Sequence, residues 1–182
     1  MSAQDRAHWD GVYTGRGPLG PDAVGLPPVF AGCESEFPGR GQALELACGR
    51  GGAAVWLARR GMEVLGVDVS AAAVSAAREL AARCDVADRC RFEVGDLDHG
   101  LPAGPPADVI VCHRFWAPAL TGAIISRLAP RGLLAISALS AVGATPGRYR
   151  VKAGELDTAF AGLDRVASGE GEGIAWLVAR RI

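Results

Sequence analysis

The feature that most constrains this chain is a glycine-rich turn between an apolar segment and an alanine-rich one. Residues 42–47 are mostly apolar, as in a buried parallel strand, and contain one carboxylate, Glu45. Gly49 and Gly51 follow, and from Ala53 the sequence is typical of a helix. Glycine lets the backbone approach a ligand closely and adopt φ values that other residues avoid. Strand, turn and helix predict the first half of a βαβ unit, whose ligands bind beyond the carboxyl ends of the strands.

A second apolar run, residues 62–67, follows the helix and ends at Asp68. An acid roughly 20 residues beyond a glycine turn is placed to accept hydrogen bonds from ribose hydroxyls. The turn also matches the dinucleotide fingerprint G-x-G-x-x-A, so an NAD(P)-binding oxidoreductase is one interpretation. Glu45 argues against it, because a negative charge beside the loop repels a pyrophosphate and suits an ammonium group instead.

The run Glu45-Leu-Ala-Cys-Gly-Arg-Gly resembles the first motif of class I S-adenosylmethionine (SAM)-dependent methyltransferases, an acid followed by G-x-G. The resemblance continues along most of the chain, and the pattern L-x-P-x-G-x-L at 128–134 is similar to one that recurs in the family. It implies a Rossmann-like α/β sandwich: a mostly parallel central sheet with an antiparallel C-terminal hairpin strand and helices on both faces. It also implies SAM as cofactor, with S-adenosyl-L-homocysteine (SAH) as product. W-D-x-x-Y at 9–13 looks like the start of the small-molecule group around the tellurite-resistance and thiopurine methyltransferases.

The resemblance assigns the parts of the cofactor to the ends of successive strands. Glu45 and the glycine loop would hold the methionyl end, and Asp68 the ribose. Asp96 would meet the adenine, although an Asp at the end of a strand is also an ordinary turn residue. Cys48 departs from the family, which often has glycine there, but it is small enough to leave the loop intact. The full set of expected cofactor-binding residues is Glu45, Ala47, Cys48, Gly49, Gly51, Asp68, Val69, Asp96, Leu97 and His113.

Bulky polar and aromatic side chains at 113–116 follow the predicted strand 107–112. In the family the transferring methyl points to this strand end. His113 could take a proton from a nucleophile, because its unperturbed pKa is about 6.5. It could equally be structural, because methyl transfer often needs positioning more than a base. The catalytic candidates are His113, Arg114 and Trp116, and the substrate-binding candidates are Trp9, Tyr13, Phe115 and Trp116.

The chain is predicted to be one domain, residues 1–182, with a core at 41–182. Residues 4–13 predict a helix, and 15–40 are rich in Gly and Pro and predict a loop. The aromatic residues of the helix either fix it to the core or, as the resemblance implies, help it to close over the cofactor. Apolar residues of the loop either line a pocket or pack the loop down. Residues 1–40 are therefore predicted to be an N-terminal helix and a lid-like loop of the domain.

The C-terminal half contains a predicted third strand and further elements, in the order strand 90–94, helix 117–128, strand 133–137, loop 138–152, helix 153–160 and strands 163–167 and 174–179. The basic residues of the loop, Arg148, Arg150 and Lys152, either meet an acidic substrate or form a solvated face. The last two strands are joined by a glycine-rich segment and predict an antiparallel hairpin. Such a hairpin is the ending of a methyltransferase and not of a dinucleotide-binding half-domain.

Composition limits the partners. The 182 residues carry 19 Lys plus Arg and 20 Asp plus Glu, a net charge of −1, which argues against a basic nucleic-acid-binding face. Apolar runs are interrupted before membrane-spanning length, and the first residues lack the hydrophobic region of a signal peptide. Five cysteines without a C-x-x-C pair predict a cytoplasmic protein with no metal site.

The sequence thus predicts a SAM-dependent methyltransferase acting on O, N, S or a heavier chalcogen of a small molecule, without nucleic-acid or membrane partners. A second interpretation is a SAM-binding regulatory or partner subunit without turnover, and a third is the oxidoreductase. Neither the methyl acceptor nor the oligomeric state is specified by the sequence.

Overall fold

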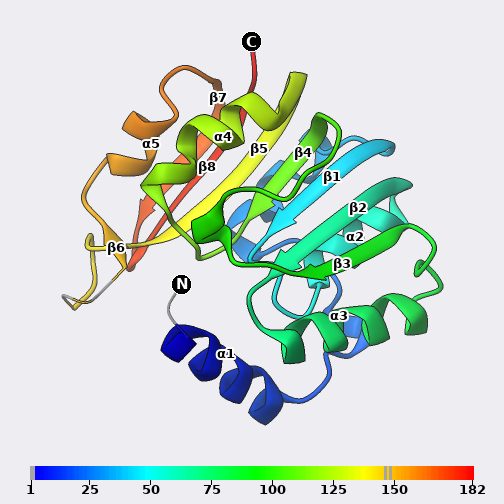
Figure 1. Ribbon diagram of the computed structural model, residues 1–182. Coiled ribbons are helices and arrows are strands. Elements are labelled where there is room, and N and C mark those ends of the chain that lie inside the picture. Colours follow the sequence, from blue (N-terminus) through cyan, green and yellow to red (C-terminus); the bar gives the residue numbers. More distant parts are fainter. Residues whose placement is uncertain (1–2, 146, 148) are drawn as a thin grey trace.

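A single twisted sheet organises the fold (Figure 1). The computed structural model describes residues 3–145, 147 and 149–182. Seven strands follow the order β3-β2-β1-β4-β5-β8-β7, and β6 pairs with β5. β8 runs antiparallel between β5 and β7, and the other described pairs are parallel, so the predicted fold class is confirmed. The strands are β1 (Gly41–Leu46), β2 (Met62–Asp68), β3 (Cys90–Val94), β4 (Ala107–Cys112), β5 (Leu128–Ser140), β6 (Arg150–Val151), β7 (Asp164–Gly171) and β8 (Ile174–Arg180).

Helices cover both faces of this sheet. The α-helices are α1 (Ala3–Arg16), α2 (Gly52–Arg59), α3 (Ala71–Arg83), α4 (Thr121–Arg127) and α5 (Glu155–Ala159). Short 3₁₀ helices are η1 (Pro21–Ala23), η2 (Pro28–Glu36), η3 (Leu97–His99) and η4 (Pro118–Leu120). In the described part of the chain, no helix is long and apolar enough to cross a membrane.

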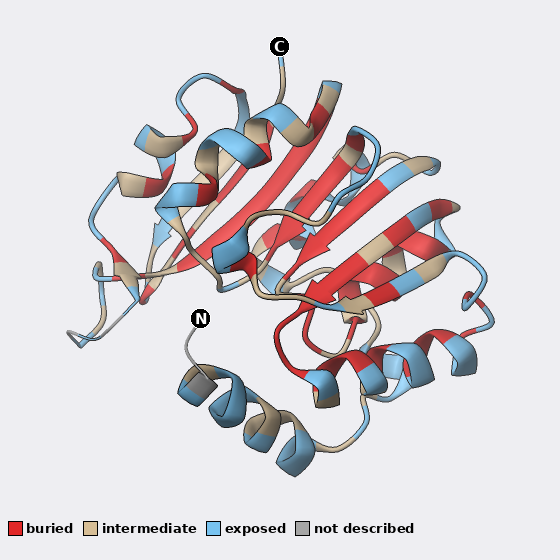
Figure 2. Ribbon diagram, viewed as in Figure 1, coloured by how far each residue is buried: buried red, intermediate tan, exposed pale blue. Residues whose placement is uncertain are grey.

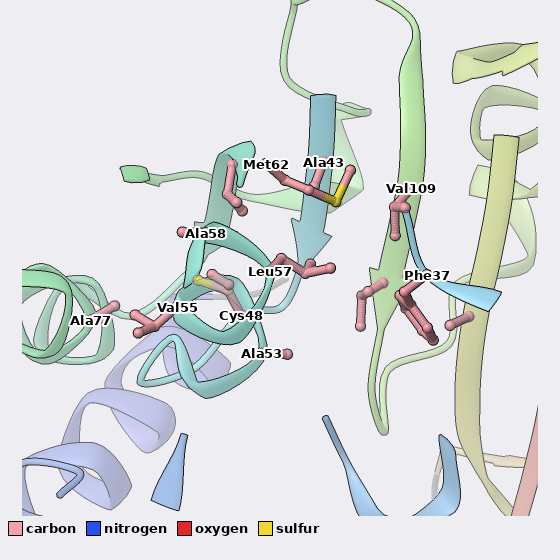
Figure 3. Packing of buried hydrophobic residues seen from close by; sticks show 14 of the residues in the cluster. Phe37, Ala43, Cys48, Ala53, Val55, Leu57, Ala58, Met62, Ala77 and Val109 are labelled. Atoms are coloured by element: carbon pink, nitrogen blue, oxygen red, sulfur yellow. The ribbon is translucent and has the colours of Figure 1, made fainter. Parts of the chain in front are cut away.

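The core has two layers because successive strand residues face opposite sides of the sheet. Ala43 of β1 packs with α2, α3 and η2, whereas Leu44 and Leu46 pack with α4 and α5. The central strands are almost wholly buried (Figure 2), and Figure 3 shows residues of α2 in the same buried cluster as Met62, Ala77 and Val109. Burial on both faces explains why these strands are nearly continuous apolar runs in the sequence.

The parallel register places four strand ends at one edge. Leu46 of β1 pairs with Val67 of β2 and with Cys112 of β4, and Asp68 pairs with Val94 of β3. The segments that follow β1, β2, β3 and β4 therefore meet at the same side of the sheet, where α1 also lies (Figure 1). This register brings the candidate site residues that follow these strands to one side of the sheet, as the sequence predicts.

The predicted helix 117–128 is wrong in extent. Its first turn is the 3₁₀ helix η4, and α4 ends at Arg127. Leu128 already belongs to β5 and pairs with Ala107, while the Arg131 amide donates to the Arg181 carbonyl, 3.0 Å away. Tertiary pairing with β4 and the chain end thus makes β5 longer than the predicted strand 133–137.

Other predicted boundaries also differ. The N-terminal helix extends to Arg16, and nine residues of the predicted loop 15–40 form η2, stabilised by burial of Phe30 and Cys33. The predicted loop 138–152 contributes the end of β5 and all of β6. The predicted helix 153–160 is shorter and begins at Glu155.

Candidate cofactor and substrate site

The turn after β1 has the left-handed backbone that the glycines predict. The φ angles of Ala47, Gly49 and Gly51 are 52°, 52° and 77°. A Cβ on Gly51 would lie 2.8 Å from the Cβ of Ala77, so α2 and α3 can approach this closely only at a glycine. Cys48 fits the loop: it is buried, and its amide donates to the Val67 carbonyl of β2 at 3.0 Å.

Asp68 is joined directly to this loop. Its Oδ2 accepts the Gly49 amide at 2.8 Å, and its Oδ1 accepts the Ser70 amide at 2.9 Å. The carboxylate is only 5% exposed, and burial raises its pKa above the ordinary value. Each oxygen keeps a further lone pair, so a ligand hydroxyl could still bind there. The structure therefore brings together the acid and the glycine turn, two features that are 19 residues apart in the sequence.

Glu45 lies on the α2 side of the sheet and contacts the start of that helix. Its Oε2 accepts the Ala54 amide at 2.8 Å, which stabilises one of the unpaired N–H groups of the first turn. Burial raises the pKa of Glu45 to about 8. One oxygen of the carboxylate predicted to meet an ammonium group is thus a helix cap, and its other oxygen has no partner among the described residues.

Asp96 follows β3 and caps η3. Its Oδ1 accepts the Asp98 amide at 3.0 Å, and its Oδ2 lies 3.9 Å from the guanidinium of Arg6 on α1. The turn interpretation of Asp96 is thus confirmed, whereas its adenine contact stays a prediction. Leu97 is buried against the second core layer, and Val69, after β2, is buried as well.

The N-terminal helix is fixed over the loop by polar contacts. Asp10 accepts hydrogen bonds from the Ser70 hydroxyl at 2.6 Å and from the Ala72 amide at 3.2 Å. The Tyr13 hydroxyl lies against Gly49, since a Cβ there would be 2.9 Å from it. Burial, followed by the nearby charge of Asp68, raises the pKa of Tyr13 to about 12. Trp9 is 38% exposed and contacts Tyr13, with ring centroids 6.0 Å apart.

Beyond β4, His113 is held by residues from two other elements. Its Nδ1 lies 2.7 Å from the hydroxyl of Ser137 on β5, and its ring meets Phe30 of η2 edge-on at 6.3 Å. Burial, and secondarily the charge of Arg114, lowers the pKa of His113 to about 4. The imidazole is therefore neutral at physiological pH.

The neighbouring candidates differ in their surroundings. Arg114 is exposed, has a left-handed φ of 56°, and donates its amide to Ser137 Oγ at 3.0 Å. Trp116 packs edge-on against Phe160 at 6.0 Å, and Phe115 also packs on the second core layer. Both aromatic rings are half-buried, so packing accounts for part of each.

Of the basic residues around β6, Arg150 is held by backbone carbonyls. Arg150 donates to the carbonyls of Ser140 at 2.7 Å and of Gly173 at 3.3 Å, so its guanidinium joins backbone segments. Arg148 lies outside the described residues. Within the described ranges, no group of three or more His, Cys, Asp or Glu side chains could hold a metal ion.

Sequence reasoning missed three contributors to the site. Ser137 was visible only as the polar residue at the end of the apolar run 133–136, and nothing in the sequence connects it to His113. Phe30 is one of the apolar residues of the predicted loop 15–40, which either line a pocket or pack the loop down, and it is fully buried. Asp10 belonged to the W-D-x-x-Y motif, but its contact with Ser70 depends on how α1 meets α3.

The comparisons with known proteins agree with this geometry. Residues 43–132 match a family model described as "Methyltransferase domain". The ribosomal RNA small subunit methyltransferase C of Alcanivorax borkumensis is 39% identical over 83 residues, which are 46% of this chain. The match covers 25% of that protein, so the chain spans about a quarter of its length.

Two solved structures share the fold. Geranyl diphosphate C-methyltransferase from Streptomyces coelicolor, in complex with Mg²⁺, geranyl diphosphate and SAH, has a TM-score of 0.69 at 16% identity, covering 97% of this chain and 96% of that one. A structure titled for the conversion of a disulfide bond into a thioacetal group during echinomycin biosynthesis has a TM-score of 0.70 at 23% identity, covering 97% and 92%. Residues 43–132 thus match a methyltransferase domain, and the sheet order and the glycine turn after β1 give the chain the fold of the class I SAM-dependent methyltransferases, a family whose cofactor is SAM.

Proposed function

We propose that this protein transfers a methyl group from SAM to a nucleophilic atom of a small molecule. The observation that carries the proposal is the hydrogen bond between Gly49 and Asp68, which joins the glycine turn to the acid at the end of β2. A ligand with an ammonium group at one end and a ribose at the other fits these acceptors, because the Asp68 carboxylate of β2 contacts the glycine turn and the Glu45 carboxylate of β1 contacts the start of the helix that follows it.

The residues of the chain have separate tasks in this proposal. Asp68 orients the ribose through the lone pairs that its two backbone contacts leave, and the unpaired oxygen of Glu45 receives the ammonium group. Tyr13 and Asp10 hold α1 over the loop and exclude water. SAM supplies an electrophilic methyl carbon, and His113 orients the acceptor beside it. Alignment of this kind can contribute several kcal/mol to lowering the barrier.

Trp9, Tyr13, Phe115 and Trp116 are proposed to select the acceptor, whose reactive atom is O, N, S or a heavier chalcogen. The W-D-x-x-Y motif that lies on α1 supports a place near the tellurite-resistance and thiopurine group. The net charge of −1 supports a small molecule over a nucleic acid, and we propose the cytoplasm as its place of action.

A second candidate is a SAM-binding subunit without turnover. The low pKa of His113 favours it, because the residue beside the expected methyl position does not act as a base at physiological pH. A fold and a cofactor site do not by themselves guarantee chemistry. The oxidoreductase interpretation is weaker, because β8 runs antiparallel between β5 and β7.

Calorimetric titration with SAH tests the cofactor site. We expect wild type to bind and Asp68→Asn to lose roughly 10-fold or more in affinity, because hydrogen bonds to charged groups contribute about 1.5–3 kcal/mol. Asp164→Asn is the matched control, since this exposed acid begins β7 at the opposite edge of the sheet. Unchanged binding by Asp68→Asn would contradict the ribose contact.

Turnover is then tested with SAM labelled in its methyl group. Acceptors of each class (thiols, carboxylates, amines and phenols) are offered to the protein, and label is sought in the product. Label in an acceptor, lost in Asp68→Asn, supports the methyltransferase. SAH binding without transfer to any acceptor would support the regulatory subunit instead.

A further inference from the structure

The buried Ser137 hydroxyl joins β5 to the segment that follows β4. Its oxygen accepts the amide hydrogen of Arg114 at 3.0 Å and lies 2.7 Å from Nδ1 of His113. Ser137 itself is 0% exposed. These are its only side-chain contacts among the described residues, so the hydroxyl hydrogen has one acceptor within reach, the imidazole nitrogen.

This count assigns the tautomer of His113. If Nδ1 carried the hydrogen, it would donate to Ser137, and the hydroxyl hydrogen would be buried with no acceptor, which costs about 1–3 kcal/mol. If Nδ1 is bare, it accepts the hydroxyl hydrogen and every group at the junction is satisfied. The single N–H hydrogen of the neutral imidazole then sits on Nε2.

We propose that Ser137 fixes His113 as the Nε2–H tautomer, so that His113 is a hydrogen-bond donor to the methyl acceptor and not a general base. The inference rests on the proposed function and deepens it, because it defines a chemical class of substrate. His113 is the group that touches the acceptor, and Ser137 is a positioning residue that acts through it.

The surroundings of His113 support this role. Phe30 covers one edge of the ring, and Ser137 occupies Nδ1. Nε2 has no partner among the described residues, yet no side-chain nitrogen or oxygen there is both buried and unpaired, so Nε2 stays accessible. Burial, followed by the positive charge of Arg114, lowers the pKa of His113.

An accessible N–H beside a positive charge is suited to an anion. The acceptor that fits is therefore already deprotonated, such as a thiolate or a carboxylate. Its lone pair forms the bond to the methyl carbon, the carbon–sulfur bond electrons remain on sulfur, and the sulfonium becomes a neutral thioether. Charge and atoms balance without a proton transfer, so no base is needed.

The tautomer can be measured without substrate by long-range ¹H–¹⁵N correlation of ¹⁵N-labelled protein. The expected spectrum shows a protonated Nε2 and a bare Nδ1 for His113 at neutral pH, with His8 and His99 as internal references. In Ser137→Ala the preference for one tautomer should be lost, because Nδ1 no longer has a donor. A protonated Nδ1 in wild type overturns the proposal, and this result stands even if Ser137→Ala does not fold.

Two substitutions at His113 separate a donor from a base. The amide N–H of glutamine can replace Nε2–H but cannot accept a proton, so His113→Gln should retain roughly tenfold more methyl transfer than His113→Ala. Equal loss in both would overturn the donor role. In the acceptor screen, transfer should favour ionised thiols and carboxylates over neutral phenols, and the reverse order would overturn the substrate class. SAH titration keeps the two proposals apart, since a failure to bind SAH would refute the proposed function and leave the tautomer assignment intact.

Discussion

The Asp10 carboxylate accepts the Ser70 hydroxyl hydrogen at 2.6 Å, which joins the N-terminal helix to the start of α3 across 60 residues of sequence. Ser70 also caps α3, accepting the Ala73 amide at 3.1 Å. The Ser70 hydroxyl thus caps α3 and also holds α1, which covers the loop. How firmly α1 covers the site depends on this contact.

We expect Asp10→Ala to loosen α1 while leaving the core folded. Removing a side chain that accepts two hydrogen bonds at a helix start costs about 0.5–2 kcal/mol. Amide hydrogens of α1 should exchange roughly tenfold faster, and those of β1 and β4 should be nearly unaffected. Asp22→Ala, an exposed acid in η1, is the control. If both variants exchange alike, Asp10 does not hold the helix.

The same contact makes docking of α1 sensitive to acid. The hydrogen bond from Ser70, followed by that from Ala72, lowers the pKa of Asp10 below its ordinary value of 3.8. Its contribution is fully present above that value and is lost as pH falls through the lowered pKa. Exchange in α1 should therefore rise at acid pH in wild type, and this dependence should vanish in Asp10→Ala.

Glu45→Gln should stabilise the fold while weakening cofactor binding. Burial raises the pKa of Glu45 to about 8, so the folded state binds more protons than the unfolded state between about 4.5 and 8, and stability falls as pH rises through that interval. Glutamine keeps an acceptor for Ala54 and removes the buried charge. At pH 8 the variant should melt at least about 2–4 °C higher, the change expected from about 1 kcal/mol in a chain of this size.

The control for this prediction is Glu63→Gln, an exposed residue on β2 that pairs with Arg89 at 3.2 Å. It should leave the melting temperature nearly unchanged, because exposed ion pairs contribute little. Lower stability of Glu45→Gln at pH 8 would show that the charge itself holds α2. SAH affinity, measured on the same samples, reports the ammonium contact.

Gly51→Ala should destabilise the protein substantially. The residue has a φ of 77°, and an added Cβ would meet the Ala77 Cβ at 2.8 Å and the Phe92 ring at 3.1 Å. Left-handed strain and overpacking together cost about 2–5 kcal/mol. Gly122→Ala in α4 should be neutral or stabilising by up to about 1 kcal/mol, because nothing lies within 4 Å of its new methyl group. Denaturant unfolding of both variants measures the contrast.

His113 should make the free energy of unfolding fall as acid is added. Its pKa of about 4 in the fold lies below the unfolded value near 6.5, so the unfolded state binds more protons between these limits. Its stabilising contribution is present above pH 6.5 and is lost as pH falls toward 4. Unfolding titrations of His113→Gln should lack this part of the slope, whereas the exposed control His99→Gln should retain it.

The sequence predicted best the elements whose ends are marked by a polar residue or a glycine. β3 and β4 have the predicted bounds, and β2 ends at Asp68, because each of these strands ends at or just before a polar residue or glycine. The antiparallel pairing of β7 with β8 followed from the glycine-rich segment between them together with the family resemblance. Such strand ends can be recognised from the sequence alone, because they do not depend on the tertiary contacts of each residue.

The remaining elements depend on partners distant in the chain. η2 exists because Phe30 and Cys33 are buried against the sheet, although its Pro and Gly content predicts a loop. β5 extends beyond the predicted strand at both ends because β4, β8 and β6 pair with it. Within the site, Ser137 was not predictable, since its role arises only where β5 passes β4.

The place of β8 in the sheet has a consequence for synthesis on the ribosome. β7 has β8 as its one neighbour in the described sheet, yet β8 follows it in the sequence and pairs with β5 on its other side. As the nascent chain emerges, β1 to β5 can assemble in the order of translation, while the outer edge of β5 stays open and β7 has no strand to pair with. The sheet is complete only after residue 180 has left the exit tunnel, so β7 and β8 join it later than the five parallel strands.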